Sequence, residues 1–127
     1  MVAITGLLSG IAVKDIDAAK KFYGETLGLA MGEGAMGNAT IALPQGGVIL
    51  LYPKEDHVPA TYTCLNLEVA NIDTAVDELN AAGIELIAYG MPHQDERQIA
   101  RGKDKGWGPD IGWFTDPSGN IIGVLED

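Results

Sequence analysis

An internal repeat constrains this fold more than any other feature: the second half of the chain repeats the first at an offset of 56 residues. Residues 10–29, GIAVKDIDAAKKFYGETLGL, align with residues 66–86, NLEVANIDTAVDELNAAGIEL, with one residue of slippage. In both stretches an apolar run leads to a helix N-cap, Asp15 or Asn71, and then to apolar residues at helical spacing. Self-similarity of this kind indicates one supersecondary unit that is present twice.

Both halves also share the order of their predicted elements. Each begins with a strand, at residues 7–13 in one half and 62–69 in the other, and a helix follows. Three apolar, strand-like runs then complete each half, at residues 29–31, 40–43 and 48–52 in the first and at residues 84–89, 111–115 and 121–125 in the second. The sequence therefore predicts two βαβββ modules with mixed sheets, an α+β fold whose helices cover one face of each sheet.

Length and composition fit one domain. The 127 residues, of which 46% are hydrophobic, predict a single domain over residues 1–127, with module one at about 1–56 and module two at about 57–127. A net charge of -10 repels phosphate groups, so we expect neither nucleic acid nor a membrane surface as a partner. Cys64 is the single cysteine and no membrane-spanning segment precedes Lys14, so we expect a cytoplasmic protein.

Two motifs point to a known family. FYGETLGL at residues 22–29 and FTDPSGNIIGVLE at residues 114–126 resemble the two signatures of the vicinal-oxygen-chelate superfamily. That group includes glyoxalase I, extradiol dioxygenases and bleomycin-resistance proteins. The resemblance implies paired βαβββ modules whose curved mixed sheets form around a cavity, often completed by a second subunit. We therefore expect a homodimer.

The resemblance also implies where a metal would bind. Metal-dependent members carry His or Gln on the first strand, Glu on the fourth, His on the fifth and Glu on the last. Counting back from the helix caps transfers the first-strand and fifth-strand positions to Leu8 and Cys64. The run VILLY places the fourth-strand position at Leu50, and the turn DPSGN places the last one at Gly123. Three of the four have no ligating side chain, and one thiolate cannot hold an ion alone. The nearest carboxylate, Glu126, is expected on the opposite face because its spacing from Gly123 is odd. We expect no metal and no other cofactor.

Several aromatic or polar residues near strand ends are candidates for the cavity. The predicted ligand-binding set is Tyr52, Tyr62, Cys64, His93, Arg97, Trp107 and Trp113. His93 and Cys64 are also the catalytic candidates, since a histidine titrates near neutral pH and a thiolate is a nucleophile, although no partner group accompanies either in the sequence. Residues 91–110 read as a long loop with both charge signs, which is open to three interpretations: a lid, a subunit interface or a solvated segment.

Three functions follow from these observations. The first is a module that binds a small organic molecule in the cavity without metal. The second is a glyoxalase-like or dioxygenase-like enzyme, a lyase, isomerase or dioxygenase with a displaced or metal-free site. The third is an interaction protein that docks through residues 91–110. The intact scaffold and the missing metal ligands favour the first.

Overall fold

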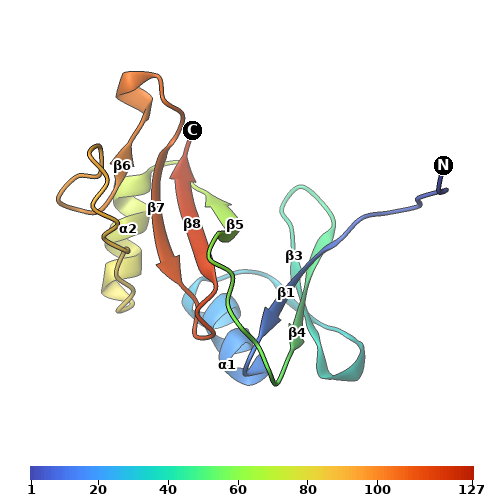
Figure 1. Cartoon of the computed structure of the whole chain (residues 1–127). Coiled ribbons are helices and arrows are strands. Elements are labelled where there is room, and N and C mark those ends of the chain that lie inside the picture. The colour runs from blue at the N-terminus through green and yellow to red at the C-terminus, as the bar shows by residue number, and fades with distance from the viewer. The chain divides into compact units, whose positions relative to one another are not determined.

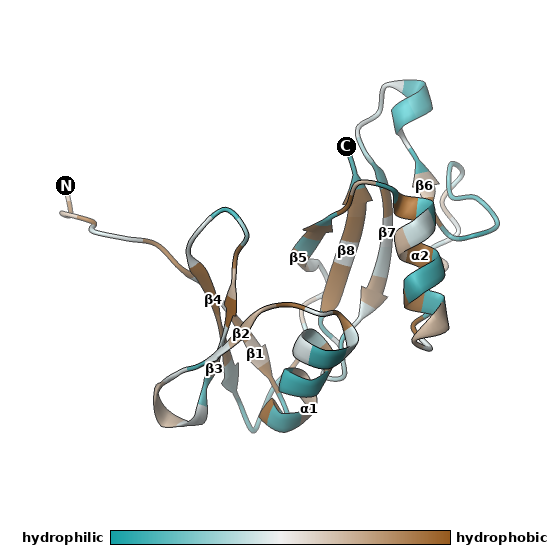
Figure 2. Cartoon of the chain, turned by 180° about the vertical axis from the view of Figure 1, so that it is seen from behind, coloured by the Kyte–Doolittle hydropathy of each residue, from teal (hydrophilic) through white to brown (hydrophobic).

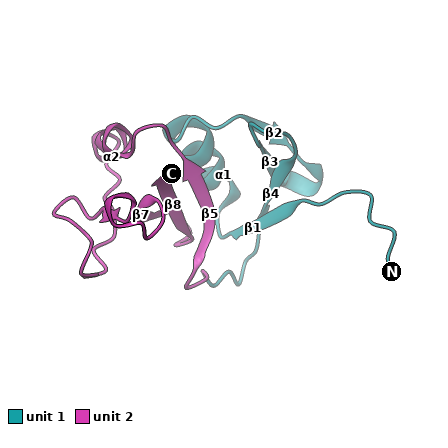
Figure 3. Cartoon of the chain, turned by 90° about the horizontal axis from the view of Figure 1, so that it is seen from above, with its two compact units in different colours: residues 1–58 teal, residues 59–127 magenta.

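The computed structural model describes residues 1–127 and divides into two compact units, Met1–Val58 and Pro59–Asp127 (Figure 3). Each unit contains one four-stranded mixed sheet and one main helix. None of the helices has both the length and the apolar character that a membrane span requires. The units are therefore described one at a time.

Unit 1, Met1–Val58, contains a sheet with the strand order β1-β4-β3-β2, and Figure 1 labels its strands β1, β3 and β4. Its strands are β1 (Ser9–Val13), β2 (Met31–Glu33), β3 (Ala39–Ala42) and β4 (Val48–Pro53). β1 and β4 are parallel, and the other pairs are antiparallel. The crossover between β1 and β2 is α1 (Ile16–Lys20), which continues as the π-helical segment η1 (Lys21–Thr26), and a short 3-10 turn, η2 (Ala35–Gly37), lies between β2 and β3.

The first helix begins where the sequence predicts. The Asp15 carboxylate accepts hydrogen bonds from the backbone N–H groups of Asp17 (3.0 Å) and Ala18 (3.1 Å), which satisfies donors that a helix start leaves free. At the other end, Gly28 has φ +75, a conformation that favours glycine at a helix end. Tyr23 from this helix is fully buried, as is Leu51 from β4.

Unit 2, Pro59–Asp127, repeats this topology with the order β5-β8-β7-β6. Its elements are β5 (Thr63–Glu68), α2 (Ile72–Ala81), β6 (Ala100–Arg101), the 3-10 turn η3 (Lys103–Lys105), β7 (Asp110–Thr115) and β8 (Ile121–Glu126). β5 pairs parallel with β8, whereas β6, β7 and β8 are antiparallel. The two predicted βαβββ modules and the α+β class are thus confirmed.

The two faces of the unit 2 sheet differ in their environment. α2 lies along one face, and its apolar residues Ile72 and Val76 are buried with Phe114 and Val124 of the sheet (Figures 1 and 2). Because side chains alternate along a strand, the neighbours Trp113 and Gly123 belong to the face away from α2. We call that second surface the pocket face.

The prediction of a strand at residues 84–89 is wrong. This segment has no strand and is joined to β7 by the bond from the Ile87 N–H to the Trp113 carbonyl (2.7 Å). Its backbone is satisfied instead by the Gln94 amide, which accepts from the N–H of Tyr89 (3.0 Å) and donates to the carbonyl of Ile87 (2.9 Å). A side-chain amide therefore takes the place of a strand partner, and the fourth strand is β6, within the segment that was predicted to be a loop.

Candidate functional site

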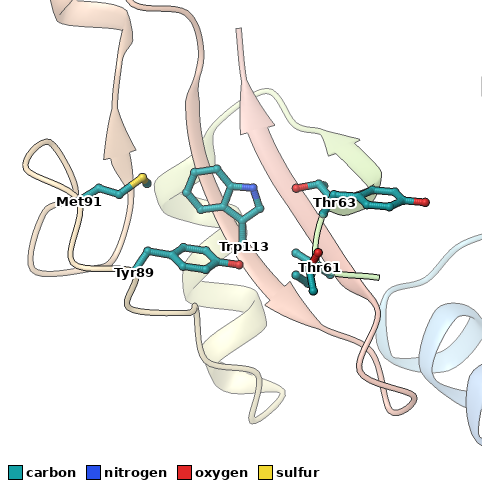
Figure 4. Close-up of a pocket in the computed structure, with 7 residues that line it drawn as sticks. Thr61, Thr63, Tyr89, Met91 and Trp113 are labelled. Carbon is teal, nitrogen blue, oxygen red and sulfur yellow. The ribbon is translucent and has the colours of Figure 1, made fainter. Parts of the chain in front are cut away.

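A pocket of about 390 Å³ opens on the pocket face of unit 2. Every residue that lines it belongs to this unit: Thr61, Tyr62, Thr63, Tyr89, Met91, Trp113 and Ile121. In Figure 4 the Trp113 indole lies with Met91 and Tyr89 to one side and Thr61 and Thr63 to the other. The pocket is therefore built on the middle of the sheet, with walls from the segments that flank it.

Two aromatic rings form the apolar wall. Trp113 and Tyr89 meet edge to face, with ring centroids 5.4 Å apart and planes at 81°. Strand β7 fixes the Trp113 backbone, and the Gln94 amide together with the Ile87–Trp113 hydrogen bond holds the segment that carries Tyr89. Tyr89 is 48% exposed, so the wall is open to solvent and offers an aromatic surface to a ligand.

A register shift in β5 places Thr63, a polar residue that lines the pocket, on the pocket face. Thr63 lies opposite Ile121 and Leu65 opposite Ile122, so Cys64 is an extra residue in this strand. A bulge of this kind changes the alternation of side chains. Thr63 and Asn66 therefore share the pocket face although their spacing is odd. None of the residues that line the pocket is charged.

The positions of the family's metal ligands carry no donor set that suits a hard or borderline divalent ion. Leu8 directly precedes β1 and Leu50 lies in β4, both in unit 1, whereas Cys64 lies in β5 and Gly123 in β8 of unit 2. A side chain at position 123 would also be obstructed, since an added Cβ would lie less than 3.0 Å from Oδ1 of Asn66. Nowhere in residues 1–127 do three His, Cys, Asp or Glu side chains form a group able to hold a metal ion. The residues present do not fit the family metal.

Glu126, the nearest carboxylate, faces the helix side, as its spacing predicted. Its Oε1 accepts a hydrogen bond from the backbone N–H of Ile72 (3.0 Å), at the start of α2, and its Oε2 lies 2.8 Å from Nζ of Lys103. These contacts, first the Lys103 ammonium and then the Ile72 N–H, lower the pKa of Glu126. This carboxylate therefore stabilises the start of α2 and lies away from the pocket.

Cys64 lies beside the pocket without lining it. Its thiol donates to the carbonyl oxygen of Ile121 at 3.4 Å. Burial raises the pKa of the Cys64 thiol, and the negative charge of Asp116 raises it further. A cysteine whose pKa is raised stays protonated at neutral pH and is a poor nucleophile.

His93 and Trp107 form a separate cluster with Lys105. The His93 and Trp107 rings meet edge to face at 5.4 Å, and Nζ of Lys105 lies 4.8 Å from the Trp107 ring centroid. Trp107 is 65% exposed, and neither ring lines the pocket. The structure therefore brings these two predicted site residues together with each other but not with Trp113.

Arg97 and Arg101 are occupied by carboxylates. Arg97 pairs with Asp73 (2.8 Å) and with Asp77, while Arg101 holds both oxygens of Asp73 (2.8 and 3.1 Å) and one oxygen of Asp95 (2.9 Å). The hydrogen bonds from Arg101 hold the pKa of Asp73 below its ordinary value. This Arg–Asp cluster attaches residues 91–110 to the start of α2, which explains why that segment is folded.

Of the predicted ligand-binding residues, the pocket brings together Tyr62 and Trp113. Tyr52 lies in β4 of unit 1, where its ring approaches Gly10. Sequence reasoning missed Tyr89, which lies in the predicted strand at residues 84–89, and Met91, which lies in the predicted loop at residues 91–110. One signal for the pocket face was present in the sequence: Ile121 and Gly123 are two residues apart in one strand and therefore lie on the same face.

A sequence model described as the Glyoxalase/Bleomycin resistance protein/Dioxygenase superfamily matches residues 4–124. No curated protein sequence matches the chain significantly. TnmS3, an antibiotic binding protein from Streptomyces sp. CB03234, aligns with TM-score 0.68 and 24% identity over 99% of this chain and 98% of that chain. Lactoylglutathione lyase from Agrobacterium tumefaciens aligns with TM-score 0.69 and 17% identity over 97% and 94%. The fosfomycin resistance protein FosX from Listeria monocytogenes gives 0.69 and 16% over 98% and 94%. At these identities the likeness concerns the fold.

Proposed function

We propose that this chain, which belongs to the Glyoxalase/Bleomycin resistance protein/Dioxygenase superfamily, is a binding protein that takes up a small, neutral, partly aromatic molecule without the family metal. The observation that carries the proposal is the pocket on Trp113 and Tyr89, which has aromatic walls and no charged lining residue. Its volume of about 390 Å³ falls in the range of small-molecule sites.

The charges of unit 2 argue for a neutral ligand. An anionic ligand needs a free cation, but Arg97 and Arg101 are paired with Asp73, and Lys105 lies over Trp107. A cationic ligand would need a carboxylate, and none lines the pocket. A charged ligand would find no ion-pair partner among the lining residues, so the uncharged walls favour a neutral ligand.

The comparisons agree with a binding role while leaving the ligand open. The neighbour TnmS3 is described as an antibiotic binding protein, and it shares the fold over nearly the full length of both chains. The same fold also supports lyases, as the Agrobacterium neighbour illustrates. The choice between them therefore rests on the chemistry of this chain's own site.

A glyoxalase-like or dioxygenase-like enzyme remains the alternative, but no observation favours it. The positions for the metal hold Leu8, Leu50, Cys64 and Gly123. A metal-free mechanism would rely on Cys64, whose pKa is raised, or on His93, which contacts Trp107 outside the pocket. Neither group faces a ligand in the pocket.

The test uses Trp113 as its own reporter. The chain has two tryptophans, so Trp107→Phe leaves a single indole N–H signal in a ¹H–¹⁵N spectrum, that of Trp113. Titration with indane should shift this signal saturably, whereas indane-2-carboxylate, which has the same skeleton and a charge, should leave it in place. Absence of a saturable indane shift contradicts the binding proposal. A stoichiometric divalent ion in protein purified without chelators contradicts the metal-free part.

A further inference from the structure

Three residues form a row across the pocket face. In the sheet register Asn66 of β5 lies opposite Gly123 of β8, and Gly123 lies opposite Trp113 of β7. Residues opposite each other in neighbouring strands project to the same face of a sheet. The Asn66 amide and the Trp113 indole therefore flank the strand position that has no side chain.

The absence of a side chain at Gly123 determines where the Asn66 amide lies. A Cβ built on Gly123 would meet Oδ1 of Asn66 at less than 3.0 Å and the methyl group of Thr63 at 3.3 Å. Asn66 thus fills the space above β8 that a side chain at position 123 would take. Asn66 does not itself line the pocket, but Thr63 does, so the space that the Asn66 amide fills adjoins the pocket.

Asn66 is polar, exposed and unused by the fold. Its amide has two N–H donors and one carbonyl acceptor, and it forms no side-chain hydrogen bond with the rest of the chain. The amides of the capping residue Asn71 and of Gln94, in contrast, bond to backbone groups of their own segments. The amides of Asn71 and Gln94 thus stabilise the backbone of their own segments, whereas the Asn66 amide forms no such hydrogen bond.

The register shift at Cys64 brings Thr63 to the same face as Asn66. With Cys64 as the extra residue, both Thr63 and Asn66 fall on the pocket face. Bulges beside binding sites commonly redirect one side chain in this way. The amide and the aromatic wall are therefore held by the same rigid sheet, one on β5 and one on β7.

We propose that Asn66 is the hydrogen-bonding anchor of the pocket: its amide N–H donates to a carbonyl oxygen of a ligand whose aromatic part lies against Trp113. The ligand class is then a neutral aromatic carbonyl compound. This assignment rests on the proposed binding function and refines it. Gly123 is the residue that leaves room for the anchor.

The test compares two probes that differ only in a carbonyl group, indane and 1-indanone, in the Trp107→Phe background. The wild-type pocket should bind 1-indanone about fivefold more tightly than indane, the effect of one net hydrogen bond. In Asn66→Ala this preference should vanish, while the affinity for indane changes less than about twofold. Asn66→Asp, of the same shape but unable to donate when ionised, should also lose the preference. Asn80→Ala, an exposed asparagine on α2, is the matched control and should retain it.

The possible outcomes separate the assignment of Asn66 from the binding function. Retention of the ketone preference in Asn66→Ala, in protein whose remaining amide signals show an intact fold, overturns the assignment of Asn66. Equal affinity of the wild-type pocket for both probes also overturns it, yet leaves the binding function standing. If neither probe shifts the Trp113 signal, the binding function falls and the assignment falls with it.

Discussion

A row of three cross-strand neighbours occupies equivalent positions in the sheets of the two units, but its residues differ. In unit 1, Gly10 of β1 lies opposite Leu50 of β4, which lies opposite Thr40 of β3. The repeat offset of 56 residues takes Gly10 to Asn66, and the corresponding row in unit 2 is Asn66, Gly123 and Trp113.

This exchange shows how one scaffold yields two surfaces. In unit 1 the glycine is on the first strand and an apolar side chain occupies the fourth. In unit 2 the glycine is on the last strand, so a polar amide reaches over it beside an indole. The strand order is the same in both sheets. The position of the glycine therefore decides whether this face presents the side chain of Leu50 or the amide of Asn66, and the third position adds Thr40 in unit 1 and Trp113 in unit 2.

The largest effect is expected at the third position of the row. Trp113→Ala should weaken binding of 1-indanone about tenfold or more, because an aromatic anchor commonly accounts for much of the affinity of a site. Thr40→Ala, its counterpart in unit 1, should change the affinity by less than about twofold. Ligand-observed NMR measures both variants without the indole reporter. Equal losses in the two variants would contradict the assignment of binding to unit 2.

The second test makes the unit 2 row resemble that of unit 1. Gly123→Ala adds only a Cβ, which must displace the Asn66 amide, the flexible end of a side chain. We expect the preference for 1-indanone over indane to fall from about fivefold to about onefold, as in Asn66→Ala. Combining the two substitutions should produce no further change in the probe ratio. An additive loss in the double variant would mean that position 123 acts independently of Asn66.

The third test concerns the Arg–Asp cluster, which belongs to unit 2. Hydrogen bonds from Arg101 lower the pKa of Asp73 from its ordinary 3.8, so the folded state holds the ionised form more strongly than the unfolded chain does. This stabilisation is complete well above pH 3.8 and is lost as the pH falls through the lower pKa of the folded state. Asp73→Asn should therefore reduce the free energy of unfolding at pH 7, by about 1 kcal/mol for such partly exposed pairs.

Chemical denaturation at several pH values checks this expectation. The difference between wild type and Asp73→Asn should shrink as the pH falls below 3.8. Asp104→Asn, which removes the same charge from the exposed turn η3, should leave the free energy of unfolding at pH 7 within about 0.5 kcal/mol of wild type. A constant difference from pH 7 to pH 3 would mean that the ion pairs make no contribution.

The smallest effect is expected at Cys64. Burial raises the pKa of its thiol, so labelling by a disulfide reagent at pH 7 should be slower than for free cysteine and should accelerate as the pH rises. Cys64→Ser should change the affinity for indane by less than about twofold, since the thiol does not line the pocket. Rapid labelling at pH 7 would reopen the nucleophile interpretation.

Local chemistry explains which parts of the fold could be predicted. Asp15 and Asn71 cap the two helices as expected, because a cap depends on residues only two or three positions away. The wrong strand at residues 84–89 has a different origin. Its apolar run is strand-like, but the amide of Gln94 takes the hydrogen bonds that a neighbouring strand would make. A pattern of hydrophobicity contains no information about such a side chain.

The candidate site divides in the same way. The sequence alone shows that Leu8, Leu50 and Gly123 cannot bind a metal ion through their side chains, because the identity of a side chain decides whether it has a donor atom for the metal. Arg97 was a reasonable candidate for a ligand, yet in the structure its partners are Asp73 and Asp77, on a helix 24 and 20 residues earlier in the chain. Spacing along the sequence gives no sign of such a pairing.

The sequence by itself determined the repeat, the helix caps, the βαβββ modules and the chemistry missing from the family positions. Each of these follows from residue identity or from a short local period. Only the tertiary structure decided that Cys64 is an extra residue in β5, that Thr63 and Asn66 consequently share the face of Trp113, and that Asn66 lies over Gly123. The physical reason is that a strand's register depends on its hydrogen bonds to a distant strand, and one inserted residue transfers every later side chain to the other face.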